Sequence, residues 1–242
     1  ILFFTYSLKS KPNNTESLFF RGLSNIHLKK KNNLLLAIQD FTRSILIKPT
    51  YQVYVNRSAA YIFLKEYEKS IKDCNKAIEA NRKNSKAYFN RAISNLYLSR
   101  FDEAKNDINK DIKLNKNSEY DSYLLKGLIE QKAGDYKEAI KSFKKVLNFT
   151  GLKGGDMLLS IQKCSLNNLF IGDIRSAIEY AKDGLEKSEI YRGLNYLGES
   201  EPWMTYLSYC FIKLENFNQA YYWCNKIILK CPKKYELEFL II

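Results

Sequence analysis

The side chains that most often carry catalysis are scarce in this chain. Its single histidine is His27, and the sequence shows no nucleophile–base pattern around it. A metal site built on imidazole would need a second histidine, and the sequence contains none. We therefore interpret His27 as an ordinary residue of a helix and expect no histidine-dependent catalysis.

Five cysteines, an odd number, are spread over the chain at Cys74, Cys164, Cys210, Cys224 and Cys231. No pair has C-x-x-C spacing, so we predict neither a disulfide framework nor a zinc site. Cys74 and Cys224 fall on apolar stripes, where a free thiol behaves as a small hydrophobe. This usage is typical of a reducing compartment, and we expect a cytoplasmic location or another reducing intracellular one.

Two further patterns resemble catalytic or cofactor motifs only superficially. The glycines of residues 151–155 lack the G-x-x-x-x-G-K-[ST] order of a phosphate-binding loop, and no strand precedes them, so we predict a turn. The pair Asp102 and Glu103 lies on predicted solvated surface, where a raised carboxyl pKa is not expected. We predict a protein that is not an enzyme and has no metal site and no cofactor.

The remaining candidates for chemistry are asparagines. Asn56-Arg57 and Asn90-Arg91 are 34 residues apart. An amide side chain can donate to a carbonyl and accept from an N–H, so a row of asparagines can hold the main chain of a peptide whatever its sequence. A structural role in closing a helix hairpin explains the same spacing equally well.

A recurring phrase shows which elements must position these residues. An aromatic residue stands three positions before a small one in Phe101–Ala104, Tyr136–Ala139 and Phe217–Ala220, and Ser70 replaces the alanine after Tyr67. The small residues fall at positions 37, 70, 104, 139, 177 and 220, in steps of 33, 34, 35, 38 and 43. Helical periodicity flanks each of them, so each unit is predicted to be a helix hairpin whose two helices approach closely at the small residue.

These phrases resemble the tetratricopeptide repeat. Gly127 and Ala139 in one unit, and Ala220 and Pro232 in another, match signature positions of that family. The resemblance implies an all-α fold, a right-handed superhelical solenoid of about six antiparallel helix hairpins. Only Pro49 and Pro232 stand at the repeat-ending proline position, and the last two steps exceed 34 residues.

The family register divides the chain into one continuous array with flanking segments. The repeats are predicted near residues 18–50, 51–84, 85–118, 120–153, 158–191 and 201–234. Residues 1–17 are expected to flank the array, and residues 235–242 to begin a further or capping helix. Because both ends are apolar and the first residue is not Met, we expect the chain to begin and end inside a longer protein.

The resemblance also implies a binding groove lined by the first helix of each hairpin. The family's groove positions correspond here to Val55, Asn56, Phe63, Lys86, Phe89, Asn90, Ile93, Tyr97, Leu124, Leu128, Lys163, Leu166, Phe170, Tyr206 and Tyr209. This largely apolar set with a few polar side chains suits an extended or helical peptide. Packing between repeats is the competing explanation for many of these aromatic residues.

We accordingly expect a scaffold that binds another protein. Acidic segments are among the candidate partners, and we expect the chain to belong to a larger complex. One alternative is a co-chaperone-like clamp for acidic chaperone tails. Asn56 and Lys86 match that clamp, but Asn90 replaces its arginine. The first repeat offers Phe19 and Leu23, or Gly22 and Ile26, none of which binds a carboxylate.

The second alternative is nucleic-acid binding, which only the charge supports. There are 39 Lys and Arg against 26 Asp and Glu, giving a formal net charge of +13. The lysines are spread over polar faces, so a solvated surface is the preferred interpretation and nucleic acid is not an expected partner. No apolar run is long enough to span a membrane.

Overall fold

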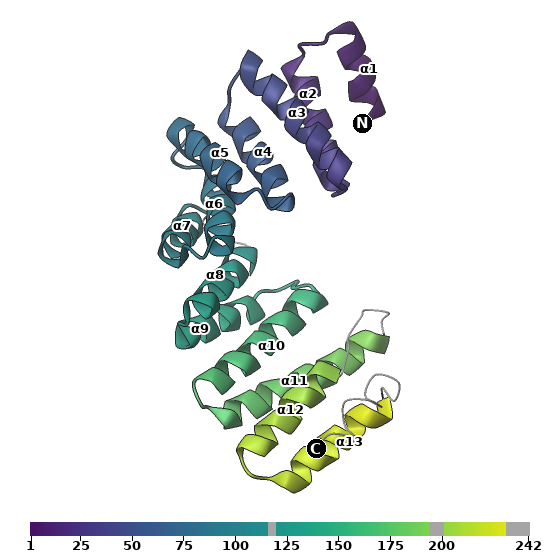
Figure 1. The fold of residues 1–242 in the computed structure, drawn as a ribbon, viewed down its shortest axis with the longest axis vertical. Coiled ribbons are helices and arrows are strands. Elements are labelled where there is room, and N and C mark those ends of the chain that lie inside the picture. The colour runs from purple at the N-terminus through teal and green to yellow at the C-terminus, as the bar shows by residue number, and fades with distance from the viewer. Residues whose placement is uncertain (116–119, 194–200, 231–242) are drawn as a thin grey trace. The chain divides into compact units, whose positions relative to one another are not determined.

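The computed structural model describes residues 1–115, 120–193 and 201–230, and all secondary structure there is helical. Thirteen α-helices occur in these residues (Figure 1). They are α1 (Leu2–Ser10), α2 (Thr15–His27), α3 (Lys31–Ile47), α4 (Tyr51–Phe63), α5 (Tyr67–Ala80), α6 (Ser85–Tyr97), α7 (Phe101–Leu114), α8 (Tyr120–Ala133), α9 (Tyr136–Leu147), α10 (Gly154–Phe170), α11 (Ile174–Gly193), α12 (Glu201–Lys213) and α13 (Phe217–Lys230).

From α2 onward the helices form six hairpins, α2/α3 to α12/α13, each with a first and a second helix (Figure 1). The predicted all-α solenoid of helix hairpins is confirmed. The small residues of the repeated phrase lie in the second helices of the hairpins. Ala37, Ser70, Ala104, Ala139 and Ala177 are fully buried. A larger side chain at these points would force the helices apart, which is why the sequence repeats a small one.

Each hairpin turn contains one residue in the left-handed region of backbone conformation. Gly134 and Gly172 occupy two of these positions, whereas Lys29, Lys65, Ser99 and Glu215 occupy the other four with φ between 52° and 61°. A side chain makes this conformation unfavourable, so four of the six turns carry a small backbone strain.

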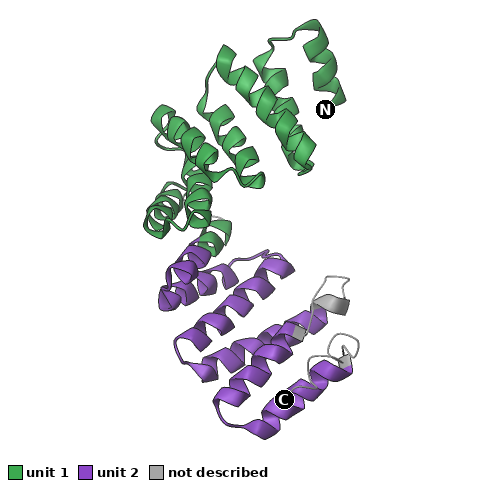
Figure 2. Cartoon of the chain, viewed as in Figure 1, with its two compact units in different colours: residues 1–125 green, residues 126–242 purple. Residues whose placement is uncertain are grey.

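The chain divides into two compact units, residues 1–125 and residues 126–242, with the boundary inside α8 (Figure 2). We expected one continuous array. Because each hairpin of a solenoid packs mainly on its neighbours, such an array has no single central core to unite its ends.

Unit 1 begins with α1, which packs on α2 and occupies part of the segment expected to flank the repeats. The first hairpin starts at Thr15, three residues before the predicted start at residue 18. The cause lies in α3, which has 17 residues where α5 and α7 have 14. The extra residues, Lys31 to Asn33, add one turn at the start of α3, and this turn changes the repeat register.

In unit 2, two extended helices contribute to the longer repeat steps. α10 has 17 residues and α11 has 20. Gly151 lies in the turn before α10, but Gly154 and Gly155 are its first two residues, so the predicted glycine turn is in part a helix start. The predictions for Pro232, Cys231 and residues 235–242 fall outside the described residues. No described helix is both long and apolar enough to span a membrane.

Candidate functional site

Among the residues that the structure describes, the cysteines and the histidine do not form a reactive site. Cys74, Cys164 and Cys210 are buried free thiols. Burial raises the pKa of the Cys74 and Cys210 thiols to about 11 and that of Cys164 to about 12, so these thiols stay protonated and unreactive at neutral pH. His27 lies exposed at the end of α2.

Five of the predicted groove residues line one cavity of about 300 Å³ in unit 1, which we call the Asp111 cavity. Its walls come from the first helices α4 and α6, the end of the second helix α7 and the start of α8. The lining residues are Val55, Asn56, Ala59, Ser85, Lys86, Phe89, Asn90, Asp111, Asn115, Asp121 and Ser122. The structure thus brings Val55, Asn56, Lys86, Phe89 and Asn90 together.

Sequence reasoning missed the other side of this cavity, namely Asp111, Asn115, Asp121 and Ser122. One signal was present. Asp111 follows Asp107 by four residues, so α7 places two carboxylates on the same face, and both are buried. An aspartate on a buried helix face is unusual, and in most proteins such a residue is paired with another polar or charged group.

The predicted aromatic residues at the ends of first helices lie outside the Asp111 cavity. Tyr97 stacks on Tyr67 of the preceding hairpin with ring centroids 4.8 Å apart, and in unit 2 Phe170 stacks on Tyr136 at 4.6 Å. Phe63 lies beneath the Lys29 ammonium at 5.7 Å. These contacts join successive hairpins, which agrees with the packing explanation.

The other predicted residues are dispersed. Ile93, Leu124, Leu128, Lys163, Leu166 and Tyr206 are half-buried, and Tyr209 is exposed. Tyr206 lies 3.4 Å from the amide nitrogen of Gln162, and Tyr209 lies beneath the Lys213 ammonium. Burial lowers the pKa of Lys163, and the charge of Lys132 lowers it further. None of these residues lines the Asp111 cavity.

The two asparagines make different bonds. Asn56 donates its amide Nδ2 to the Gln52 carbonyl of its own helix at 2.8 Å. Asn90 donates its Nδ2 to the Val55 carbonyl at 3.1 Å and to the Ser58 hydroxyl at 2.9 Å, and so links α6 to α4. Asn90 thus uses its amide group inside the protein, whereas Asn56 uses one of its two amide protons there, and the side-chain oxygen of each residue can accept a bond from a ligand.

The arginines beside them close the hairpins. Arg57 donates Nε and Nη2 to the two carboxylate oxygens of Asp73, both at 2.7 Å. Arg91 binds Asp107 in the same two-pronged way at 2.8 and 2.7 Å. Arg21 and Asp40 repeat the arrangement in the first hairpin. Each pair joins a first helix to its second helix through strong charge-assisted bonds.

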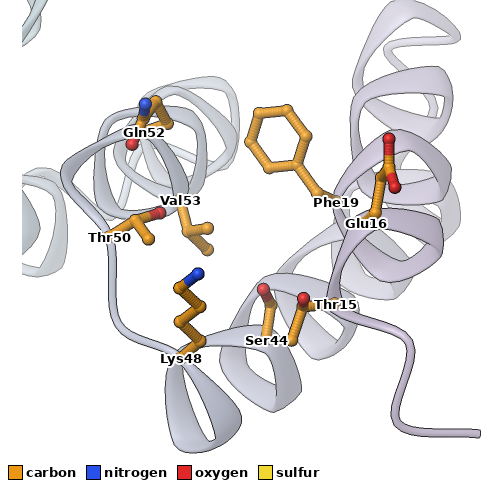
Figure 3. A pocket seen from close by; sticks show the side chains of 8 residues that line it. All are labelled: Thr15, Glu16, Phe19, Ser44, Lys48, Thr50, Gln52 and Val53. Atoms are coloured by element: carbon orange, nitrogen blue, oxygen red, sulfur yellow. The ribbon is translucent and has the colours of Figure 1, made fainter.

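A second cavity in unit 1, of about 270 Å³, lies at the equivalent place between α2, α3 and α4 (Figure 3). Phe19 of α2, Val53 of α4 and Lys48, which follows α3, point toward one another there. Phe19 and Leu23 pack against the buried cluster of Ala37, Phe41 and Val53. In the first repeat, the positions that would need a clamp lysine and asparagine thus belong to an apolar contact.

Comparison with known proteins supports the resemblance to the tetratricopeptide repeat in two stretches of the chain. A family model of the tetratricopeptide repeat matches residues 51–84 and 120–150. The crystal structure of PilW, a widely conserved type IV pilus biogenesis factor, aligns with a TM-score of 0.72 at 15% sequence identity, covering 94% of this chain and 98% of that chain. No curated protein matches the sequence.

Two further solved structures are similar. The crystal structure of the MamA protein gives a TM-score of 0.62 at 20% identity, covering 72% of this chain and 92% of that one. YrrB, described as a TPR protein with an unusual peptide-binding site, gives 0.61 at 14% identity, covering 76% and 91%. At such identities the likeness shows the fold alone.

Proposed function

We propose that this chain, whose helix hairpins have the fold of tetratricopeptide repeats, is a non-catalytic scaffold that binds a segment of another protein along the first helices of unit 1. The observation that carries the proposal is the Asp111 cavity. It opens among three successive hairpins and combines an apolar ring, Phe89, with the polar side chains Asn56, Asn90 and Lys86. Peptide sites in proteins commonly combine such apolar contacts with a few polar groups that fix the main chain.

The structure of YrrB supports the proposal at the level of the fold, because a protein with the same arrangement of hairpins is described as having a peptide-binding site. The asparagine side-chain oxygens support it at the level of chemistry. An extended segment carries backbone N–H groups at regular intervals, and carbonyl-type oxygens accept from them whatever the side chains of the segment are.

The chaperone-tail alternative finds little support at this cavity. Asn56 and Lys86 are both present, but the carboxylates of Asp111 and Asp121 line the same cavity. A ligand that ends in several carboxylates would meet like charge there. The first repeat adds Phe19 and Leu23, which are packed against apolar residues.

The proposal is tested by blocking the cavity. Ala59 lines it, so Ala59→Trp should fill it, whereas Ala80→Trp makes the same change on exposed surface at the end of α5. Random dodecapeptides displayed on phage are selected against the chain, and the affinities of selected peptides are measured by fluorescence anisotropy. We expect Ala59→Trp to weaken binding by about tenfold or more, and Ala80→Trp to leave it unchanged.

Circular dichroism checks that both variants keep their helices. If no peptide is enriched, or if the two variants bind the selected peptides equally well, the proposed site is wrong.

A further inference from the structure

Unit 1 contains four buried aspartates, and three of them have a cationic partner. Asp40, Asp73, Asp107 and Asp111 expose between 3% and 5% of their surface. The first three each bind an arginine through both carboxylate oxygens. Asp111 is different. Within the described residues its carboxylate has no basic partner, and its bonds come from hydroxyls, that of Ser122 at 2.6 Å and that of Ser85.

The repeat itself shows that the fold does not need an acid at this position. One hairpin earlier, Val55, Ala77 and Ala87 form a closed apolar cluster between α4, α5 and α6. The residues at the same places one hairpin later, 34, 34 and 35 positions on, are Phe89, Asp111 and Ser122. All three line the Asp111 cavity. A junction that is packed with small apolar side chains in one repeat has become a polar cavity in the next.

A buried carboxylate without a counter-charge is unfavourable, because it loses hydration and gains no ion pair in return. Burial accordingly raises the pKa of Asp111, although the hydroxyls of Ser122 and Ser85 lower it. Asp121 adds a second carboxylate to the wall, and the C-terminal end of α7, beside Asn115, adds the partial negative charge of a helix terminus. The one basic lining residue, Lys86, is exposed to solvent.

We propose that the Asp111 cavity binds a lysine or arginine side chain of the partner segment, with the Asp111 carboxylate as its counter-ion. This rests on the proposed peptide-binding function and makes it specific: the segment carries at least one basic residue, even though the net charge of the chain is +13. A positive net charge does not prevent a basic segment from binding. At physiological ionic strength, salt largely screens exposed charges that are more than about 8 Å apart, whereas a contact inside the cavity is screened far less.

The test begins with the same phage selection, performed on the chain and on Asp111→Asn. We expect peptides enriched by the unchanged chain to share a basic residue at one position, and those enriched by Asp111→Asn to lack that preference. One selected peptide is then compared with a copy whose basic residue is replaced by glutamine. Asp111→Asn should weaken the basic peptide about tenfold and the glutamine peptide less than about twofold.

Asp102→Asn is the matched control. It removes the same charge from the same helix, but at a side chain that is 92% exposed and outside the cavity, so it should leave both affinities unchanged. Enrichment of no peptide at all would show that the proposed function is wrong. If the selected peptides lack a basic residue, or if Asp111→Asn does not change their affinity, the proposed cation site is wrong. The proposed peptide-binding function would still hold in that case.

A melting curve separates a binding role from a structural one. The asparagine keeps the shape of the aspartate and removes its charge, so Asp111→Asn should melt at the same temperature as the unchanged chain or at a higher one. A lower melting temperature combined with unchanged peptide binding would instead assign Asp111 to holding α7 against α8 through Ser122.

Discussion

At the scale of single residues, the arginine–aspartate pairs are the best-defined interactions in unit 1. Each is two-pronged, each joins the helices of one hairpin, and each is largely removed from water, with side-chain exposures of 15% and 7% for Arg57 and Asp73. The Arg57 guanidinium also donates to Thr42 of the preceding hairpin at 2.9 Å. This one side chain therefore holds a hairpin closed and contacts its neighbour.

Replacing Arg57 with alanine should be strongly destabilising. It would leave the Asp73 carboxylate buried without a partner, and breaking a buried pair in this way costs about 3–5 kcal/mol. Urea unfolding followed by circular dichroism measures the loss. Arg100→Ala is the comparison, because the Arg100–Glu68 pair has exposures of 43% and 57% and should contribute less than about 1 kcal/mol. Similar losses in both variants would show that burial does not set the strength of these pairs.

The sequence located Asn56, Arg57, Asn90 and Arg91 as a repeated pattern but left two explanations open, a peptide ladder and a structural role. The structure assigns the structural role to the arginines, because their partners Asp73 and Asp107 lie 16 residues away across the hairpin. A spacing of 34 shows that two residues are equivalent. It does not show which groups surround them.

At the scale of elements, the six hairpin turns share one backbone feature although their residue types differ. Every turn needs one left-handed residue, yet the chain supplies glycine at Gly134 and Gly172 and other residues at the remaining four. The sequence signal for a turn is glycine or asparagine. Turns built on Lys29, Lys65, Ser99 and Glu215 were therefore visible only through the periodic small residues that follow them.

Lys65→Gly should stabilise the protein, because glycine adopts the left-handed conformation without the steric cost that Lys65 bears at φ 61°. We expect a gain of about 0.5–1 kcal/mol in the free energy of unfolding. The reverse change, Gly134→Ala, should lose about 1 kcal/mol. A Cβ atom added at Gly134 meets nothing within 4 Å, so crowding cannot account for such a loss. Thermal melts of both variants measure the two effects, and opposite signs are required.

At the scale of the whole molecule, the net charge of +13 and the Asp111 cavity favour ligands of opposite charge. The charge attracts anions from a distance and without specificity. The cavity acts only at contact and favours a cationic side chain. Salt concentration separates the two, because it weakens distant attraction far more than a buried contact.

A single-stranded RNA oligonucleotide should therefore bind only through the overall charge. We expect its affinity to fall steeply between about 50 and 200 mM salt and to be unaffected by Asp111→Asn. Over the same range, a peptide selected for the cavity should lose much less affinity. Fluorescence anisotropy with labelled RNA and labelled peptide gives both curves. RNA binding that persists at 200 mM salt would revive the nucleic-acid alternative.

By itself, the sequence determined the all-α solenoid, because the signals for it are local. The apolar stripe, the small residue and the aromatic three positions before it all lie within one hairpin, and their repetition makes each hairpin reinforce the others. Through its resemblance to the tetratricopeptide repeat, it also implied a groove set that includes Val55, Asn56, Lys86, Phe89 and Asn90, and these five line one cavity.

Only the tertiary structure decided which of these residues share a cavity and what lies opposite them. Asp111 and Ser122 reach the cavity from α7 and α8, and the extra turn of α3 shifted the register of the first repeat. The physical reason is that a cavity between hairpins depends on side-chain volume and charge at three helices together. The sequence period shows that two positions are equivalent, but it does not show that one junction is closed by Val55, Ala77 and Ala87 and the next is open.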